Sequence, residues 1–151
     1  MLEYDVIYEN EAYREKVPEE SVRNIADYYG ARILASGSFS ISFVSPQTIQ
    51  KENRDYRGID SPTDILTFAL QDGEEDFIIP ETEEKEWGDM LICLEKMEEN
   101  AGDFSVTPAE ELERLIVHGL LHLSGQDHAT NDFGTEPMLI LQEKLLKSRE
   151  M

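Results

Sequence analysis

All three histidines of the chain lie in one short segment, HGLLHLSGQDH, at residues 118–128. On a helix, His118 and His122 would stand one turn apart on the same face, with about 5–6 Å between their Cβ atoms. Gly125 can end that helix, because glycine adopts the left-handed C′ conformation without a Cβ penalty, and the chain can then return His128 as a third ligand. Three imidazoles leave one position of a tetrahedral metal open, as in catalytic zinc sites.

The spacing of this segment matches the metzincin zinc motif, H-E-x-x-H-x-x-G-x-x-H, at every position except one. Gly119 stands where a metalloprotease has the glutamate that takes a proton from metal-bound water. We therefore expect one Zn²⁺ per chain, with other divalent transition metals as alternatives. Peptide hydrolysis of the zincin kind is disfavoured, and a zinc peptidase would need a glutamate from elsewhere in the chain.

A few charged side chains could assist a metal centre. Asp127 precedes the third histidine and could orient an imidazole, although a loop aspartate without that role is an equal alternative. Lys51 and Arg54 are typical of a solvated helix face. Arg57 differs from them because it precedes Gly58 at a helix end, where its planar guanidinium could contact a phosphate oxygen.

Two further segments have simple structural interpretations. Residues 61–64, SPTD, are typical of a turn, and a role in substrate binding is secondary. Gly88 lies in an expected strand, where glycine allows close approach of a backbone or ligand or marks a bulge. We expect Cys93 to pack in the sheet without a catalytic role.

Length and composition indicate one domain over residues 1–151, long enough to hold a hydrophobic core. The formal charge of -20, from 13 basic and 33 acidic residues, argues against non-specific binding to nucleic acid or to anionic membranes. A polyanionic substrate would therefore need a local basic patch. The single cysteine, and the absence of a signal peptide or an apolar run of about 18 residues, predict a cytoplasmic protein.

Hydrophobic periodicity predicts an α+β fold with a mixed four-stranded sheet packed with helices. Thr107 and Glu110 form a capping box that opens a central helix, whose inward apolar stripe includes Leu123. This helix carries the first two motif histidines. Gly30 and Gly58 are expected to end two earlier helices. An acidic segment at 71–86 is expected to be a mobile loop. The expected strands are 2–8, 38–44, 65–70 and 87–94, and the other expected helices are 18–30, 46–56, 95–100 and 136–147.

Three stretches together resemble the YbeY family of bacterial endoribonucleases: NRDYRGIDSPTDILTF at 53–68, GDMLIC at 88–93 and HGLLHLSGQDH at 118–128. The resemblance implies a metalloprotease-like domain that cleaves single-stranded RNA in ribosomal RNA maturation and ribosome quality control. It also implies that His118, His122 and His128 bind the metal and that Arg57 is the functional arginine. Gln126 and Thr67 depart from residues usual in the family, and the acidic segment has no assigned counterpart.

The resemblance and the residues together give a hypothesis for the mechanism. Zinc-bound water would hydrolyse RNA phosphodiesters with assistance from Arg57, and Asp64 or Asp89 could transfer protons or support the ligands. The expected partners are single-stranded RNA and ribosomal RNA, with ribosomal proteins or a ribosome-associated GTPase as further candidates and no membrane. A ribosome-associated binding protein with a structural metal is the alternative from another class.

Overall fold

The computed structural model describes residues 1–70, 85–128 and 131–150, which form one α+β domain. The acidic segment expected as a mobile loop lies outside the described residues over 71–84. The strands are β1 (Leu2–Tyr8), β2 (Gly37–Phe43), β3 (Ile65–Ala69) and β4 (Glu86–Ile92). The helices are α1 (Glu11–Lys16), α2 (Glu19–Ile33), α3 (Pro46–Arg57), α4 (Leu94–Asp103), α5 (Pro108–Leu123) and α6 (Pro137–Glu150).

The four strands form a mixed sheet in the order β1-β2-β4-β3, as the predicted fold class requires. β1, β2 and β4 are parallel, and β3 is antiparallel to β4. Residues along β1 alternate, with Glu3 and Asp5 exposed and Tyr4 half-buried against Phe39 of β2, whose ring centroid is 4.9 Å away. This alternation gives β1 one side toward the helices and one polar side.

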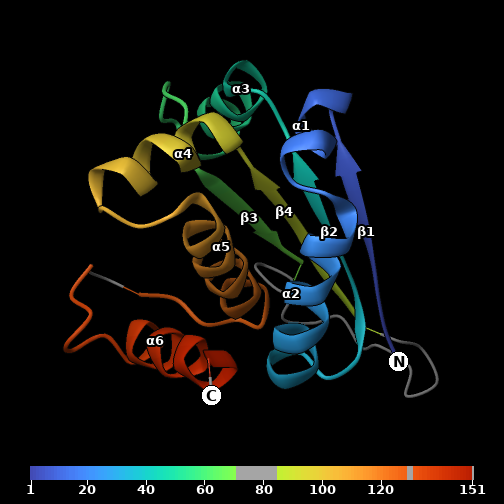
Figure 1. Ribbon diagram of the computed structural model, residues 1–151, viewed down its shortest axis with the longest axis vertical. Coiled ribbons are helices and arrows are strands. Elements are labelled where there is room, and N and C mark those ends of the chain that lie inside the picture. Colours follow the sequence, from blue (N-terminus) through green and yellow to red (C-terminus); the bar gives the residue numbers. More distant parts are fainter. Residues whose placement is uncertain (71–84, 129–130, 151) are drawn as a thin grey trace.

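The central helix α5 packs against β3 and β4 and also contacts α2, α4 and α6 (Figure 1). Its start follows the sequence prediction, because the Thr107 side chain accepts from the backbone N–H of Glu110 and the Glu110 side chain accepts from that of Thr107. Burial on nearly all sides suits a helix that is apolar around most of its circumference. No helix in the described part of the chain is long and apolar enough to span a membrane.

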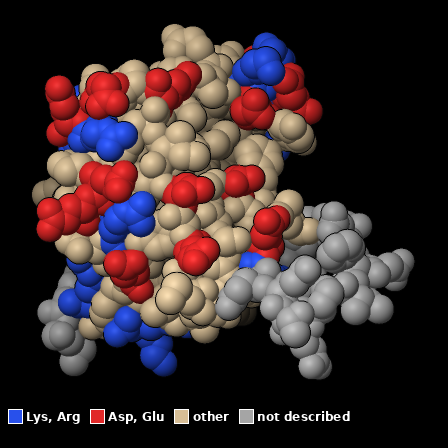
Figure 2. Space-filling model, turned by 90° about the vertical axis from the view of Figure 1, so that its right-hand side faces the viewer, with Lys and Arg blue, Asp and Glu red and all other residues tan. Residues whose placement is uncertain are grey.

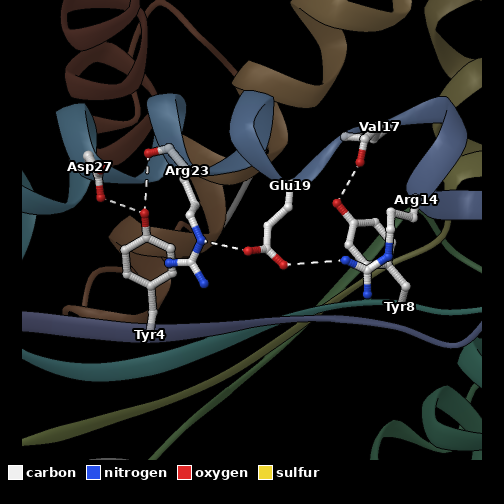
Figure 3. A network of polar contacts seen from close by, with 7 residues as sticks. All are labelled: Tyr4, Tyr8, Arg14, Val17, Glu19, Arg23 and Asp27. Carbon is white, nitrogen blue, oxygen red and sulfur yellow. Dashed lines mark hydrogen bonds and ion pairs between the residues drawn. The ribbon is translucent and has the colours of Figure 1, made fainter.

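A polar network fastens the first two helices to the edge strand β1 (Figure 3). The Tyr4 hydroxyl donates to the Asp27 carboxylate at 2.5 Å, and the Tyr8 hydroxyl donates to the Val17 carbonyl at 2.5 Å. Between these contacts, Glu19 pairs with two arginines, Arg23 at 3.0 Å and Arg14 at 3.6 Å. The network therefore links α2 and the end of α1 to the edge strand of the sheet.

Several helix boundaries differ from the sequence prediction. Gly30 does not end its helix: α2 continues to Ile33, and a Cβ on Gly30 would lie 2.6 Å from Leu2 Cδ2. Glycine is thus explained there by close packing on β1. Helix α1 was not predicted, and α4 is longer than the expected 95–100. Gly58 does end α3, with a left-handed φ of 71°.

Gly88 combines the two interpretations that the sequence left open. Ser38 pairs with Glu86 and Phe39 pairs with Gly88, so Trp87 is the extra residue of a bulge. The φ of Gly88 is +136°, and a Cβ there would lie 2.0 Å from the Phe68 carbonyl oxygen. Only glycine permits this approach of β4 to β3.

Replacing Gly88 with alanine is expected to lower the free energy of unfolding by at least about 2 kcal/mol, because a rigid backbone oxygen must move and the φ is strained. Gly102→Ala is the control, since nothing lies within 4 Å of its added Cβ in α4. That variant is expected to be as stable as the parent or up to about 1 kcal/mol more stable. Urea denaturation measures both, and equal stability of the two variants would contradict the close approach.

Candidate metal centre

The three motif histidines converge at the end of α5. His118 and His122 stand one turn apart, and their Nε2 atoms are 3.0 Å from each other. His128 returns to the same place, with its ring centroid 5.2 Å from that of His118. Within the described residues, each histidine offers one nitrogen to a common point, and the three nitrogens lie within 4.8 Å of one another. One metal ion could therefore bind all three imidazoles.

The turn after α5 brings His128 back, as the sequence predicted from Gly125. This glycine has a φ of 103° and donates its backbone N–H to the His122 carbonyl at 3.0 Å. The next N–H, of Gln126, donates to the Leu121 carbonyl at 3.1 Å. Two backbone hydrogen bonds thus hold the reversal that precedes the third histidine.

Each of the two helical imidazoles has a partner for its second nitrogen. Nδ1 of His118 lies 2.7 Å from Oε1 of Gln142, which is buried on α6. Nδ1 of His122 lies 3.1 Å from the Gln126 carbonyl oxygen. Both partners accept a hydrogen bond from Nδ1–H and leave the Nε2 lone pairs directed at the common point. Such hydrogen bonds fix the orientation of metal-binding histidines.

Gln142 was missed by the sequence analysis, although the sequence carries a signal for it. It follows Leu139 by three residues and precedes Leu146 by four, so it lies on the apolar stripe of α6. A polar residue at a core position of a helix indicates a buried hydrogen-bonding partner. What the sequence could not give is the partner, which lies 24 residues away on α5.

The surroundings keep the helical imidazoles neutral. Burial lowers the pKa of His118, and it lowers the pKa of His122 to about 4, where the neighbouring His118 contributes further. Desolvation disfavours the imidazolium form, and two cations this close would repel each other. Both rings are therefore unprotonated at neutral pH, the form that binds a metal.

Asp127 does not hydrogen-bond to the His122 imidazole. Its carboxylate is 3.8 Å from Nδ1 of His122, is 84% exposed, and accepts the backbone N–H of His128 at 2.8 Å. The contact to His122 comes instead from the main chain at residue 126. Glutamine at that position, a departure from the YbeY pattern, therefore leaves this contact intact.

Gly119 is enclosed where α5 approaches the sheet. A Cβ there would lie 2.6 Å from Met90 Cε and 3.1 Å from Ile65 Cδ1. A larger side chain at the position that carries the catalytic glutamate in metalloproteases would thus require Met90 and Ile65 to move. Zincin chemistry lacks its base at this position.

The histidines line a pocket of about 430 Å³ that also includes Arg57, Asp64 and Thr67. Of the basic residues considered from the sequence, Lys51 and Arg54 pair with Asp55 at 3.2 and 3.5 Å, as a solvated helix face does. Arg57 lines the pocket at the end of α3. A guanidinium therefore lies in the same pocket as the three imidazoles.

Asp64 and Asp89, the two candidates for proton transfer, lie in different places. Asp64 lines the histidine pocket, and its carboxylate accepts from Asn100 Nδ2 at 3.0 Å. The expectation for Asp89 is wrong. Met90 points at α5, and successive side chains of a strand point to opposite faces, so Asp89 points to the face of the sheet away from α5. Asp89 accepts from Ser40 Oγ at 2.5 Å and lines a separate pocket with that residue.

The fold and this cluster define an α+β protein with a candidate three-histidine metal centre. Its fold is similar to the solution structure of a protein from Thermotoga maritima, with a TM-score of 0.58 and 29% identity, covering 96% of this chain and 87% of that one.

Sequence comparison extends this similarity. The chain is 37% identical over 133 residues to a Leuconostoc citreum protein named Endoribonuclease YbeY, covering 84% of this chain and 82% of the relative. It is 45% identical over 115 residues to the Treponema denticola protein of the same name, covering 75% and 71%. The family described as Endoribonuclease YbeY matches residues 6–150. The chain belongs to the YbeY family.

Replacing Gln142 with leucine is expected to weaken metal binding about 10–100-fold, because His118 loses the acceptor that orients it. The fold should persist, since leucine has a similar size and position 142 lies on the apolar stripe of α6. Competition titration with a chelator measures the affinity. Gln47→Leu, at an exposed position of α3, is the control. Unchanged affinity in Gln142→Leu would show that the contact does not support the metal.

The buried Glu111 predicts a pH dependence of stability. Its side chain is 4% exposed, and burial raises its pKa, with Arg114 opposing and Asp64 adding to the shift. Because the unfolded carboxyl ionises first, stability is lost as the pH rises from the unfolded pKa through the folded one. Glu111→Gln is therefore expected to be more stable than the parent at pH 8, and to lose this advantage near pH 4, in thermal unfolding followed by circular dichroism. An advantage that grows toward acid would contradict the sign.

Proposed function

We propose that the chain is a metal-dependent, single-strand-specific endoribonuclease that acts in ribosomal RNA maturation and ribosome quality control in the cytoplasm. The observation that carries the proposal is the convergence of three imidazoles beside Arg57, in a chain of the YbeY family. Zinc is the first candidate for the metal, at one ion per chain, because neutral imidazole nitrogens suit it.

Each pocket residue has a distinct role in this proposal. The metal, when bound, supplies Lewis acidity and a water that loses its proton near neutral pH. Arg57 binds the phosphate and stabilises the charge that grows on its oxygens. Asp64, held by Asn100 at 3.0 Å, accepts or returns a proton at its carboxylate. Gln142 keeps His118 in its binding orientation.

The charge distribution favours one side of the molecule for RNA. Acidic side chains lie across the middle of the surface on the side of β1 (Figure 2), and Glu3 and Asp5 are exposed along that strand. A phosphate chain would be repelled there. Arg57 and Arg114, in contrast, line pockets on the histidine side. An acidic surface away from the RNA would suit a basic partner, such as a ribosomal protein, and a ribosome-associated GTPase is a further candidate.

Labelled single-stranded RNA, incubated with parent, His122→Ala and Arg57→Ala proteins of known metal content, tests the proposal. The histidine variant is expected to lose both metal and cleavage. The arginine variant should keep its metal and lose at least about 100-fold in turnover, because its role is in the transition state. Arg54→Ala, whose guanidinium pairs with Asp55, is the matched control and should cleave like the parent.

Equal cleavage by all four proteins would identify a contaminating nuclease. A parent that binds one metal and leaves RNA intact would overturn the nuclease proposal in favour of a ribosome-associated binding protein with a structural metal. Cleavage of casein without cleavage of RNA would favour a zinc peptidase.

A further inference from the structure

A second pocket, which we call the side pocket, adjoins the histidine pocket. Its volume is about 930 Å³, and it shares Arg57, residues 63–65 and His118 with the metal centre. The remaining walls come from the end of α4, the first half of α5, the segment 131–133 and α6. Its volume is within the range of pockets that hold small ligands. A substrate strand held at Arg57 would therefore pass directly beside it.

Two exposed aromatic rings line the side pocket. Phe104 is 69% exposed and Phe133 is 50% exposed, although both belong to a residue type that is usually buried. Both lie on ordered turns. The Phe104 N–H donates to the Asn100 carbonyl at 2.9 Å, and the Gly134 N–H donates to Asp132 Oδ1 at 2.8 Å. The main chain beside each exposed ring is thus held by a hydrogen bond.

The side pocket also contains a carboxyl group that can accept hydrogen bonds. Glu111 lines the pocket from the first turn of α5, and the residue is 4% exposed. Among the described residues, no group donates a hydrogen bond to its side chain, and the nearby Arg114 pairs with Glu143 instead. A ligand that enters the side pocket and carries an N–H group could therefore donate to the oxygens of this carboxyl group.

We propose that the side pocket binds one unpaired nucleobase of the RNA, next to the phosphate held by Arg57. The base stacks on Phe104 and Phe133, and its exocyclic amino group donates to Glu111. This inference rests on the proposed endoribonuclease function and adds to it the feature of the substrate that the enzyme reads.

A nucleobase offers groups that match the side chains of the side pocket. Proteins recognise single-stranded RNA by stacking splayed bases on aromatic rings and by hydrogen bonds to their edges. A base in a duplex has its amino edge occupied by its partner and its faces covered by neighbours, so only an unpaired base can enter. Cytosine, adenine and guanine carry an exocyclic amino group, whereas uracil does not. The pocket therefore predicts a preference for these three bases over uracil.

The first test removes one base at a time. Fluorescence anisotropy in the cold measures binding of a set of RNA oligonucleotides, each with one abasic nucleotide, and a gel then checks their integrity. For the parent, one position is expected to be sensitive, with affinity falling about tenfold when that base is absent. Phe104→Ala and Phe133→Ala should bind intact RNA more weakly and lose this sensitivity. Ile7→Ala, 50% exposed on β1, is the control and should keep it.

The second test changes the identity of the base at the sensitive position. The parent should bind RNA with an amino-bearing base there more tightly than RNA with uracil. Glu111→Gln should reduce this preference, because an amide both donates and accepts. Glu99→Gln, at an exposed site on α4, should keep the preference of the parent.

The outcomes separate the two proposals. Cleavage by a parent that shows no sensitive position, or sensitivity that both phenylalanine variants retain, would overturn the side pocket and leave the nuclease intact. An unchanged base preference in Glu111→Gln would overturn the role of the carboxyl group. A sensitive position without cleavage would support the side pocket and overturn the nuclease.

Discussion

The close packing of α5 on the sheet is the constraint on which the rest of the structure depends. Gly119 has Met90 and Ile65 within contact distance of its missing side chain, so the helix lies unusually near β3 and β4. This proximity buries Ile116 and Leu120 completely. Burial of that apolar face fixes the rotation of the helix about its axis. The histidines at 118 and 122 then project toward the start of β3, where the pocket forms.

The Nδ1 atoms of the buried imidazoles require hydrogen-bond partners, and two other parts of the chain provide them. Gln142 reaches His118 from α6, and the main chain of the turn reaches His122. Burial also keeps the imidazolium form of both rings unfavourable. Desolvation makes a positive charge on either ring unfavourable, so both imidazoles are neutral at neutral pH. Through these contacts, folding brings together the neutral imidazoles that a metal ion would bind.

The segment between α3 and β3 is held by contacts that connect the metal centre to the sheet. Nδ2 of Asn53 donates to the Ser61 carbonyl at 3.0 Å, and the Cys93 N–H donates to the Asp64 carbonyl at 2.9 Å. The turn that the sequence predicted at 61–64 is therefore anchored to α3 at one end and to the residue after β4 at the other. Arg57, which precedes this turn, and Asp64, which is its last residue, line the same pocket as a result.

Local signals predicted the parts of the structure that depend on neighbours in sequence. The capping box at Thr107, the left-handed turns at Gly58 and Gly125, and the four-residue spacing of two histidines act within one or two helical turns. The mixed sheet followed from the periodicity of its strands, although the strand order did not. Local rules were wrong at Gly30, where glycine serves packing against β1, and missed the short helix α1.

The sequence by itself determined the candidate ligands, the class of fold and the resemblance to the YbeY family, because motif spacing and periodicity are properties of adjacent residues. Only the tertiary structure decided that Asp64 lies in the histidine pocket and Asp89 does not. The alternation of side chains along a strand gives two faces, but it does not say which face α5 covers. The tertiary structure also decided that Gln142 supports His118 and that Glu111 faces a second pocket. These relations join residues far apart in the chain, and long-range packing alone brings them together.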